Sequence, residues 1–157
     1  MAVMRVCRYV LAVVLTLSLT ACSTEAPPPR TAATIVKAIA AKVASARPGF
    51  VYTADTDPDH LLGQPHGYTS EATFTDNRIS PADTAGVRPG SVQKGGSVEV
   101  FADASSATIR QQRLGRLEKD APLLGSEYTF TDGPALLRVS GRLTPAQAAE
   151  YAAAFRR

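Results

Sequence analysis

Cysteine is scarce in this chain of 157 residues, which contains only Cys7 and Cys22, and the usual sequence signatures of catalysis are missing. No Gly-x-Ser-x-Gly sequence is present, so the nucleophile elbow of a hydrolase is not indicated. No glycine-rich loop precedes a predicted helix, so a phosphate-binding loop is not indicated either. Serines such as Ser70, Ser97 and Ser126 have no base that the sequence specifies. Motifs therefore assign no reaction to this chain.

A long hydrophobic run is also lacking. The most sustained one, Tyr9–Leu19, is shorter than the about 20 apolar residues that a membrane-spanning helix needs. Two arginines precede this run and small residues follow it, which together form the pattern of a secretory signal. We therefore expect residues 1–21 to be removed as a signal peptide, with translation starting at Met1 or Met4.

The residues at the end of this signal, Leu19-Thr20-Ala21-Cys22, resemble the bacterial lipobox. The resemblance implies that the Cys22 thiol becomes a diacylglyceryl thioether with acyl chains such as palmitate, because stable anchoring takes two chains. An ordinary signal peptide followed by an incidental cysteine is the alternative. The lipobox predicts an exported protein, held by lipid on the outer face of the cell membrane.

The charge of the chain changes once the signal is removed. Two of the 17 basic residues precede Cys22, which leaves 15 basic against 14 acidic residues, a net charge of +1. This balance gives no reason to expect nucleic acid as a partner. Because Cys7 is lost and Cys22 is lipidated, the mature chain has neither a free thiol nor a disulfide. No cofactor is predicted.

The residues after Cys22 are divided into a tether and a domain. Ser23–Arg30 contains three consecutive prolines and has no apolar period, which favours an extended spacer of about 3.1 Å per residue. We therefore expect residues 22–30 to be a tether and residues 31–157 to form one globular domain close to the membrane.

Three helices are predicted from apolar spacing and capping residues. The first runs from Thr31 to Arg47 and ends at Pro48-Gly49. The second is capped by Asp103 and runs to about Lys119, and in it Arg110 falls inside the apolar arc. The third begins with the capping box Thr144-Pro145-Ala146-Gln147 and buries Ala149, Ala152 and Phe155.

Alternating residues predict the strands. The predicted strands are Gly67–Thr75, Ser97–Ala102 and the hairpin Glu127–Thr131 with Ala135–Ser140, with a further short strand at Phe50–Thr53. Between them lie one helical turn at Asp57–Gly63, capped by Asp57, and a long loop at Asp76–Gly96. This order predicts an α+β fold: an antiparallel sheet of about four strands with helices packed on one face.

Three stretches resemble a group of small actinobacterial lipoproteins. They are Leu61–Ser70, Gly95–Phe101 and Leu136–Pro145, so the resemblance extends over nearly all of the predicted domain. It implies export and a single compact domain, and it transfers no catalytic residue.

A cluster of histidine and aspartate is the candidate for a metal or acid-base site. Asp55, Asp57 and Asp59 are spaced like the start of a calcium loop, but His60 and His66 stand where that loop needs glycine and glutamate. The five residues also contain the imidazole and carboxylate groups that suit borderline metals. Capping aspartates and two surface histidines are the simpler interpretation.

The remaining candidate is a binding surface. If the apolar side of each strand packs on the helices, the other side of the sheet exposes Glu71, Glu99, Phe101 and Arg138. The loop Asp76–Gly96 adds a basic strip, Arg78, Arg88 and Lys94, beside this face. We therefore expect a non-enzymatic lipoprotein that binds an envelope protein or a cell-wall component. The alternative is an envelope hydrolase or metal-dependent enzyme that uses the two histidines and the nearby aspartates.

Overall fold

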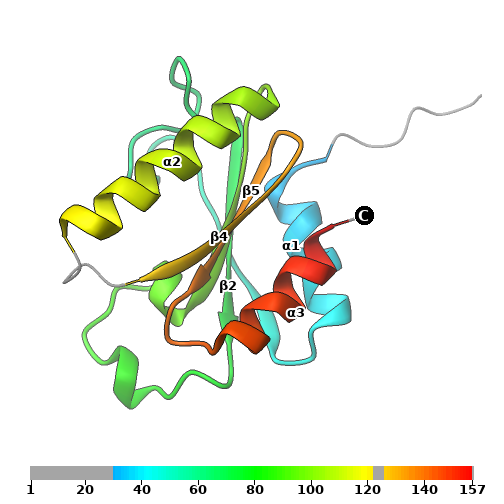
Figure 1. Ribbon diagram of the computed structural model, residues 1–157, viewed down its shortest axis with the longest axis vertical. Helices are drawn as coiled ribbons and strands as arrows, with labels where there is room; N and C mark the ends of the chain where they lie inside the picture. Colours follow the sequence, from blue (N-terminus) through cyan, green and yellow to red (C-terminus); the bar gives the residue numbers. More distant parts are fainter. Residues whose placement is uncertain (1–29, 122–125, 157) are drawn as a thin grey trace, which may run out of the picture.

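The computed structural model describes residues 30–121 and 126–156, which form a five-stranded antiparallel sheet with three α-helices packed against it (Figure 1). The spatial order of the strands is β1-β2-β3-β5-β4. Their bounds are Ala46–Val51 for β1, Ser70–Asp76 for β2, Gly95–Val100 for β3, Glu127–Asp132 for β4 and Ala135–Ser140 for β5. The helices are α1 (Ala32–Lys42), α2 (Ala104–Asp120) and α3 (Pro145–Phe155). The predicted α+β class is confirmed, with five strands rather than four because residues 46–51 form an edge strand.

The larger hydrophobic core lies between the sheet and the pair α1 and α3, which cover one face together (Figure 1). The stacked rings of Phe74 and Tyr151, with centroids 4.8 Å apart, join β2 to α3 across this core. Capping boxes begin both helices, at Thr31 and at Thr144, so the predicted start of α3 is confirmed. The predicted inner face of α3 is correct at Ala152 and Phe155, but Ala149 is exposed.

Helix α2 lies on the opposite face of the sheet, where it packs on β4 and β5 (Figure 1). Its buried residues join a second apolar cluster that includes Tyr68, Phe101 and Leu136. We expected all helices on one face, and the difference arises because α2 buries its own stripe, Ala107 and Leu114, against the side of the sheet that we expected to be wet. The sheet is therefore covered at least in part on both faces.

The first helix is shorter than predicted. It ends at Lys42, and Pro48-Gly49 lies inside β1 rather than at the end of a helix. Proline is tolerated there because β1 is an edge strand and its register shifts after Pro48. Glycine is required at position 49 because a Cβ would lie 2.6 Å from the Thr73 hydroxyl, which accepts a hydrogen bond from the Phe50 N–H.

The predicted loop Asp76–Gly96 is also shorter than expected. Asp76 ends β2, and Gly95 and Gly96 begin β3. A Cβ on Gly96 would lie 2.3 Å from the Phe74 ring, so this glycine permits close packing in a strand and is not a loop residue. Two short 3₁₀ turns, Ala82–Thr84 and Val92–Lys94, order part of the connection that remains.

The predicted signal peptide, Cys22 and the tether up to residue 29 lie outside the described residues. Within the described ranges, no helix has both the length and the apolar character needed to cross a membrane.

Candidate functional site

The face of the sheet opposite α1 and α3 carries a group of charged side chains at its centre. Strand alternation places Glu71 of β2, Glu99 of β3 and Arg138 of β5 on this face, while their neighbours in sequence enter the core. Glu71 and Glu99 are direct partners across the β2–β3 ladder. Two carboxylates are therefore held side by side, and the groups around them determine whether both can be charged.

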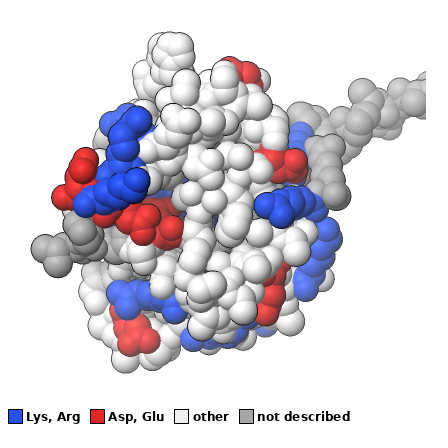
Figure 2. All heavy atoms as spheres, in the orientation of Figure 1, with Lys and Arg blue, Asp and Glu red and all other residues white. Residues whose placement is uncertain are grey.

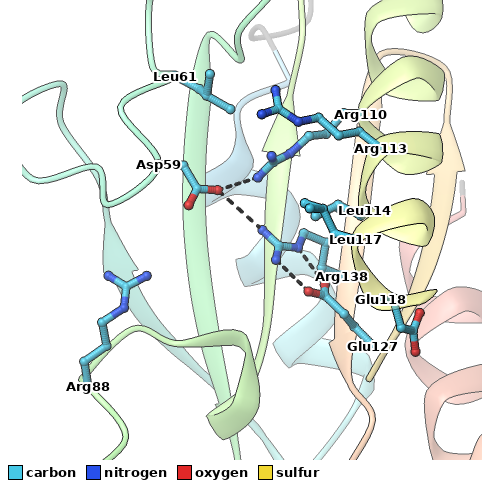
Figure 3. Close-up of a pocket in the computed structure, with 10 residues that line it drawn as sticks. All are labelled: Asp59, Leu61, Arg88, Arg110, Arg113, Leu114, Leu117, Glu118, Glu127 and Arg138. Carbon is cyan, nitrogen blue, oxygen red and sulfur yellow. Dashed lines mark hydrogen bonds and ion pairs between the residues drawn. The ribbon is translucent and has the colours of Figure 1, made fainter. Parts of the chain in front are cut away.

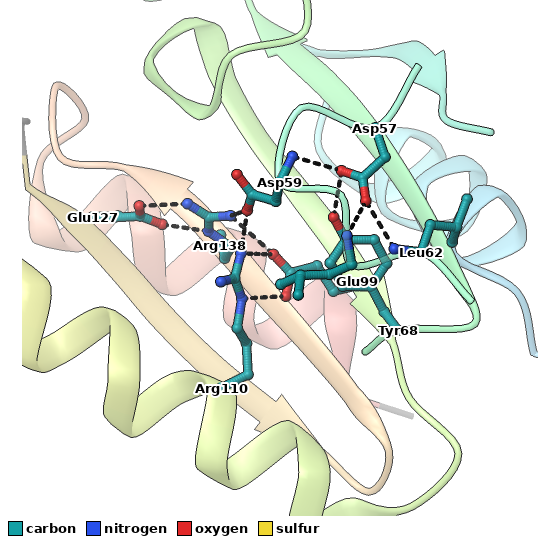
Figure 4. Close-up of polar contacts among 9 residues, drawn as sticks. Asp57, Asp59, Leu62, Tyr68, Glu99, Arg110, Glu127 and Arg138 are labelled. Carbon is teal, nitrogen blue, oxygen red and sulfur yellow. Dashed lines mark hydrogen bonds and ion pairs between the residues drawn. The ribbon is translucent and has the colours of Figure 1, made fainter. Parts of the chain in front are cut away.

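Asp57 fixes the loop that approaches this face. Its carboxylate accepts hydrogen bonds from the backbone N–H groups of Asp59, Leu61 and Leu62 at 2.7–2.9 Å. It also accepts one from the Tyr68 hydroxyl at 2.6 Å (Figure 4). Burial alone would raise the pKa of Asp57, but the Tyr68 hydroxyl and these backbone donors outweigh it and hold the pKa below its ordinary value. Residues 57–63 form turns rather than the predicted helical turn, and Asp59 is held over the sheet.

Glu99 is the centre of the charged group and is fully buried. Its Oε2 accepts from Arg110 Nε at 3.0 Å, and its Oε1 accepts from Arg110 Nη2 at 3.1 Å and from Arg138 Nη1 at 2.9 Å. Figure 4 shows both arginines pointing toward this carboxylate, one from α2 and one from β5. The arrangement meets the requirement that a buried charge be paired and hydrogen-bonded.

The two arginines have further partners that close the network. Arg138 donates from Nε and Nη2 to the two oxygens of Glu127, each at 2.7 Å, which is the bidentate geometry of a strong ion pair. Arg110 donates to Asp59. Burial would lower the pKa of Arg138, but the Glu127 and Glu99 carboxylates outweigh it and hold that pKa above its ordinary value. Two guanidinium groups and three carboxylates thus form one connected network.

A groove of about 500 Å³ runs between α2 and this network, and we call it the α2 groove (Figure 3). Its lining residues come from α2, from the loops beside β2 and β3, and from β4 and β5: Asp59, Leu61, Arg88, Arg110, Arg113, Leu114, Leu117, Glu118, Glu127 and Arg138. In Figure 3, Asp59, Leu61 and Arg88 lie across the groove from the α2 side chains. Acidic and basic side chains also gather on the surface over α2 (Figure 2).

Two other arginines of the α2 groove, unlike Arg110 and Arg138, have no ion-pair partner among the described residues. Among the described residues, neither Arg88 nor Arg113 forms an ion pair or a side-chain hydrogen bond, and both are exposed. Leu61, Leu114 and Leu117 add apolar surface to the same groove. The groove therefore combines two uncommitted guanidinium groups with an apolar strip.

A second cavity of about 140 Å³ adjoins the groove, with which it shares Asp59, Arg88, Glu127 and Arg138. We call it the side chamber, and Tyr52 and Glu71 are among its lining residues. Within the described structure the Tyr52 hydroxyl and Glu71 Oε2 are buried without a hydrogen-bond partner. Burial, with repulsion from Glu99, raises the pKa of Glu71 to about 8.

The sequence-based binding surface is not the exposed face that we predicted. Glu71, Glu99 and Phe101 are 5%, 0% and 3% exposed, and Arg138 is largely buried. The reason is that α2 and the loop that contains Asp57 cover this face, and Phe101 packs edge-on against Tyr68. Three of these residues, Glu71, Glu99 and Arg138, nevertheless meet in or beside the network.

The predicted basic strip is divided between different places. Arg78 forms ion pairs with Asp76 at 2.7 Å and with Glu150 of α3 at 2.8 Å. It therefore lies on the side of the sheet that α1 and α3 cover, away from the α2 groove. Arg88 lines both the α2 groove and the side chamber. Lys94 ends the second 3₁₀ turn and is half-buried. Only Arg88 of the three reaches the candidate site.

The predicted metal candidates have separate environments. Asp57 is a buried capping group, Asp59 binds Arg110, and Asp55 is exposed. His60 and His66 are both exposed and both have positive φ, 53° and 62°, so they are turn residues. No group of three or more potential ligands gathers anywhere in residues 30–121 and 126–156.

Sequence reasoning missed Tyr52 and Arg113 as site residues. A signal was present at Arg110, because a charged residue inside the apolar arc of a helix must find a buried partner. The acidic residues of the strands supply that partner. Comparison of the chain with known proteins adds nothing to this site, since no protein-family model, no curated protein and no solved structure gives a significant match.

Proposed function

We propose that this chain is a non-enzymatic lipoprotein that binds an acidic peptide of the cell envelope in the α2 groove. In this proposal lipid on Cys22 holds the domain at the outer face of the cell membrane, as the lipobox residues indicate. The observation that carries the proposal is the pair Arg88 and Arg113, two groove arginines without a carboxylate partner in the described structure.

The chemistry of the groove supports a carboxylate-bearing ligand. A guanidinium group binds a carboxylate through two parallel hydrogen bonds, and Arg110 and Arg138 already use this geometry within the protein. Arg88 and Arg113 present the same chemistry to the outside. Leu61, Leu114 and Leu117 can cover the apolar part of a peptide beside its carboxylate.

The enzyme alternative gains no support from the described residues. Both oxygens of Asp57 are occupied by hydrogen bonds from three backbone N–H groups and a hydroxyl, so this carboxylate is not available as a base. Neither His60 nor His66 makes a side-chain hydrogen bond to another described residue. We therefore base no function on these histidines.

A photocrosslinking amino acid at Leu117 in intact cells tests the proposal, because this side chain is exposed and lines the groove. The same group at Ala146, exposed on α3 across the sheet, is the positional control. We expect the Leu117 probe to capture a peptide with an acidic residue next to the crosslink, and the Ala146 probe not to capture it. Identical products from the two positions would refute a binding groove beside α2.

Charge removal provides the matched comparison. Arg88→Ala/Arg113→Ala should abolish the capture at position 117, whereas Arg47→Ala/Arg116→Ala removes two exposed arginines outside the groove and should preserve it. Both double variants must show the same thermal unfolding as the parent chain. Capture that survives in the groove variant would overturn the proposal.

A further inference from the structure

The side chamber is lined by a buried carboxyl group, Glu71, that has one oxygen without a hydrogen-bond partner in the described structure. Glu71 is 5% exposed, and its Oε2 has no donor among the described residues. A buried carboxyl without a partner costs the free energy of its lost hydration, about 1–3 kcal/mol or more. One oxygen of Glu71 is therefore available to a ligand, and Glu71 lines the side chamber.

The groups around Glu71 determine which ligand suits it. Glu99 of β3 and Asp57 and Asp59 of the neighbouring loop add negative charge, and Tyr68 lies against the same region. Arg138 of β5 and Arg88 also line the chamber, but the Arg138 guanidinium is already bound to Glu127 of β4 and to Glu99, and Arg88 lies at the border with the groove. An anion placed beside Glu71 would be repelled by these carboxylates. A cation would be attracted by all of them.

Tyr52 supplies the second unsatisfied group. Its hydroxyl is buried in the same chamber without a partner in the described structure, and it can accept a hydrogen bond from an N–H donor. Arg88 lines the chamber at its border with the groove and lies near enough to Tyr52 to oppose the rise that burial causes in the pKa of that tyrosine. A cationic site and an anionic site are thus adjacent.

We propose that the side chamber is a subsite for a primary ammonium group, which Glu71 and the Tyr52 hydroxyl bind while Arg88 and Arg113 bind a carboxylate of the same ligand. The inference rests on the proposed function, because the carboxylate end occupies the α2 groove. The peptide that the groove binds then ends in, or carries, a free amine as well as an acid. An ammonium group has three donors and no acceptor, which matches two buried oxygens that lack donors.

The chamber has the size for such a group. Its volume of about 140 Å³ holds several water molecules or one short aminoalkyl chain. Ordered water alone is therefore the competing occupant, and it satisfies the same two oxygens without any ligand. Binding measurements distinguish the two because water confers no preference for an amine.

The test compares 6-aminohexanoate with hexanoate, two molecules that differ in the ammonium group. Isothermal titration calorimetry is carried out on the full lipidated chain in detergent micelles. We expect 6-aminohexanoate to bind at least about tenfold more tightly, the effect of one charged hydrogen-bonded group. Glu71→Gln should reduce this preference to near unity, while Glu150→Gln, which removes a carboxylate on the other face, should leave it as in the parent chain.

The pH dependence of binding gives a second test of the subsite, and this test needs no variant. Because an ammonium group pairs with ionised Glu71, the preference for 6-aminohexanoate should rise as the pH approaches the Glu71 pKa of about 8 and should level off above it. Calorimetry in buffers of different ionisation enthalpy should also detect a proton released on binding at neutral pH. A preference that falls with rising pH would overturn the ammonium subsite.

The possible failures are distinguishable. Equal binding of the two molecules refutes the subsite and leaves the groove proposal standing, since hexanoate still reports on Arg88 and Arg113. Binding of neither molecule refutes both. Equal preference in the parent chain and in Glu71→Gln shows that the amine binds elsewhere, which also refutes the subsite.

Discussion

Glu99 and Arg110 form a two-point ion pair between β3 and α2, with Nε to Oε2 at 3.0 Å and Nη2 to Oε1 at 3.1 Å. Both side chains are buried, at 0% and 9% exposure. The pair attaches α2 to the polar face of the sheet at a point between the buried apolar residues Ala107 and Leu114 of this helix. It also fixes one side of the α2 groove, because Arg110 is among the lining residues.

Removing Glu99 should therefore destabilise the fold strongly. We expect Glu99→Ala to lower the free energy of unfolding by about 3–5 kcal/mol, because Arg110 and Arg138 would stay buried with one partner fewer. The control Glu118→Ala removes a groove carboxylate that forms no ion pair among the described residues, and should cost less than about 1 kcal/mol. Urea unfolding measures both values.

A double-mutant cycle isolates the interaction between the two side chains. The combined change Glu99→Ala/Arg110→Ala should cost less than the sum of the single changes, since the second deletion removes an unpaired charge. Strictly additive costs would show that this pair is not coupled and would contradict the described contact.

The raised pKa of Glu71 should make the stability of the fold depend on pH. Its folded-state pKa of about 8 lies above the ordinary glutamate value of 4.5, so between these values the folded chain keeps a proton that the unfolded chain has lost. The contribution of Glu71 to stability is therefore complete below pH 4.5 and is lost as the pH rises toward 8. Glu71→Gln cannot ionise and should remove this loss, which makes the variant more stable than the parent at alkaline pH by at least about 1.4 kcal/mol, the value of one pKa unit. Parallel pH profiles of the two chains in urea unfolding would contradict a buried, protonated Glu71.

Phe74 and Phe130, which both pack on the larger core, should contribute different amounts to the free energy of unfolding. Phe74→Ala should cost about 3–5 kcal/mol, because this buried ring stacks on Tyr151. Phe130→Ala should cost less, since Phe130 on the edge strand β4 is only partly buried. Phe50→Ala is the exposed reference, at 53% exposure, and should change stability by less than about 1 kcal/mol. Equal losses at all three positions would contradict the described core.

The location of the protein depends on Cys22 in our proposal. Cys22→Ala should release the chain from the membrane or leave it unprocessed, because no acyl chains can be attached. Fractionation and mass measurement of the N-terminus test this directly. A variant that stays in the membrane fraction in mature form would rule out lipid on Cys22 as the anchor.

Local signals in the sequence predicted the parts of the fold that depend on neighbouring residues. The cap at Asp103 and the capping box at Thr144 are confirmed, because each side chain accepts from a backbone N–H three residues on. The turn at Gly133 is confirmed between β4 and β5 with a positive φ of 57°. These features need no information from distant parts of the chain.

The candidate site required information that no local pattern contains. A period of two shows that Glu71 and Glu99 share a face, but it does not show whether a helix covers that face. We took charge on the strands as evidence of exposure. In fact Glu99 is buried against Arg110 of the helix α2 and Arg138 of β5, which lies 39 residues further along the chain. Combining the misplaced arginine of the second helix with the acidic strand face would have predicted a buried ion pair.

Arg30 shows where the preceding chain joins the domain. Its guanidinium binds Asp132 at 2.7 Å and the Phe155 carbonyl at 3.0 Å, and it lies over the Phe155 ring. Asp132 is at one end of β4 and Glu127 of the groove at the other, a separation of about 16 Å along the strand. A pulling force from the N-terminal side would therefore reach α1 through the backbone and the β4–β5 turn and the end of α3 through Arg30. In the function that we propose, the domain would therefore be loaded at the end of β4 that lies away from the groove, which leaves room there for a bulky partner.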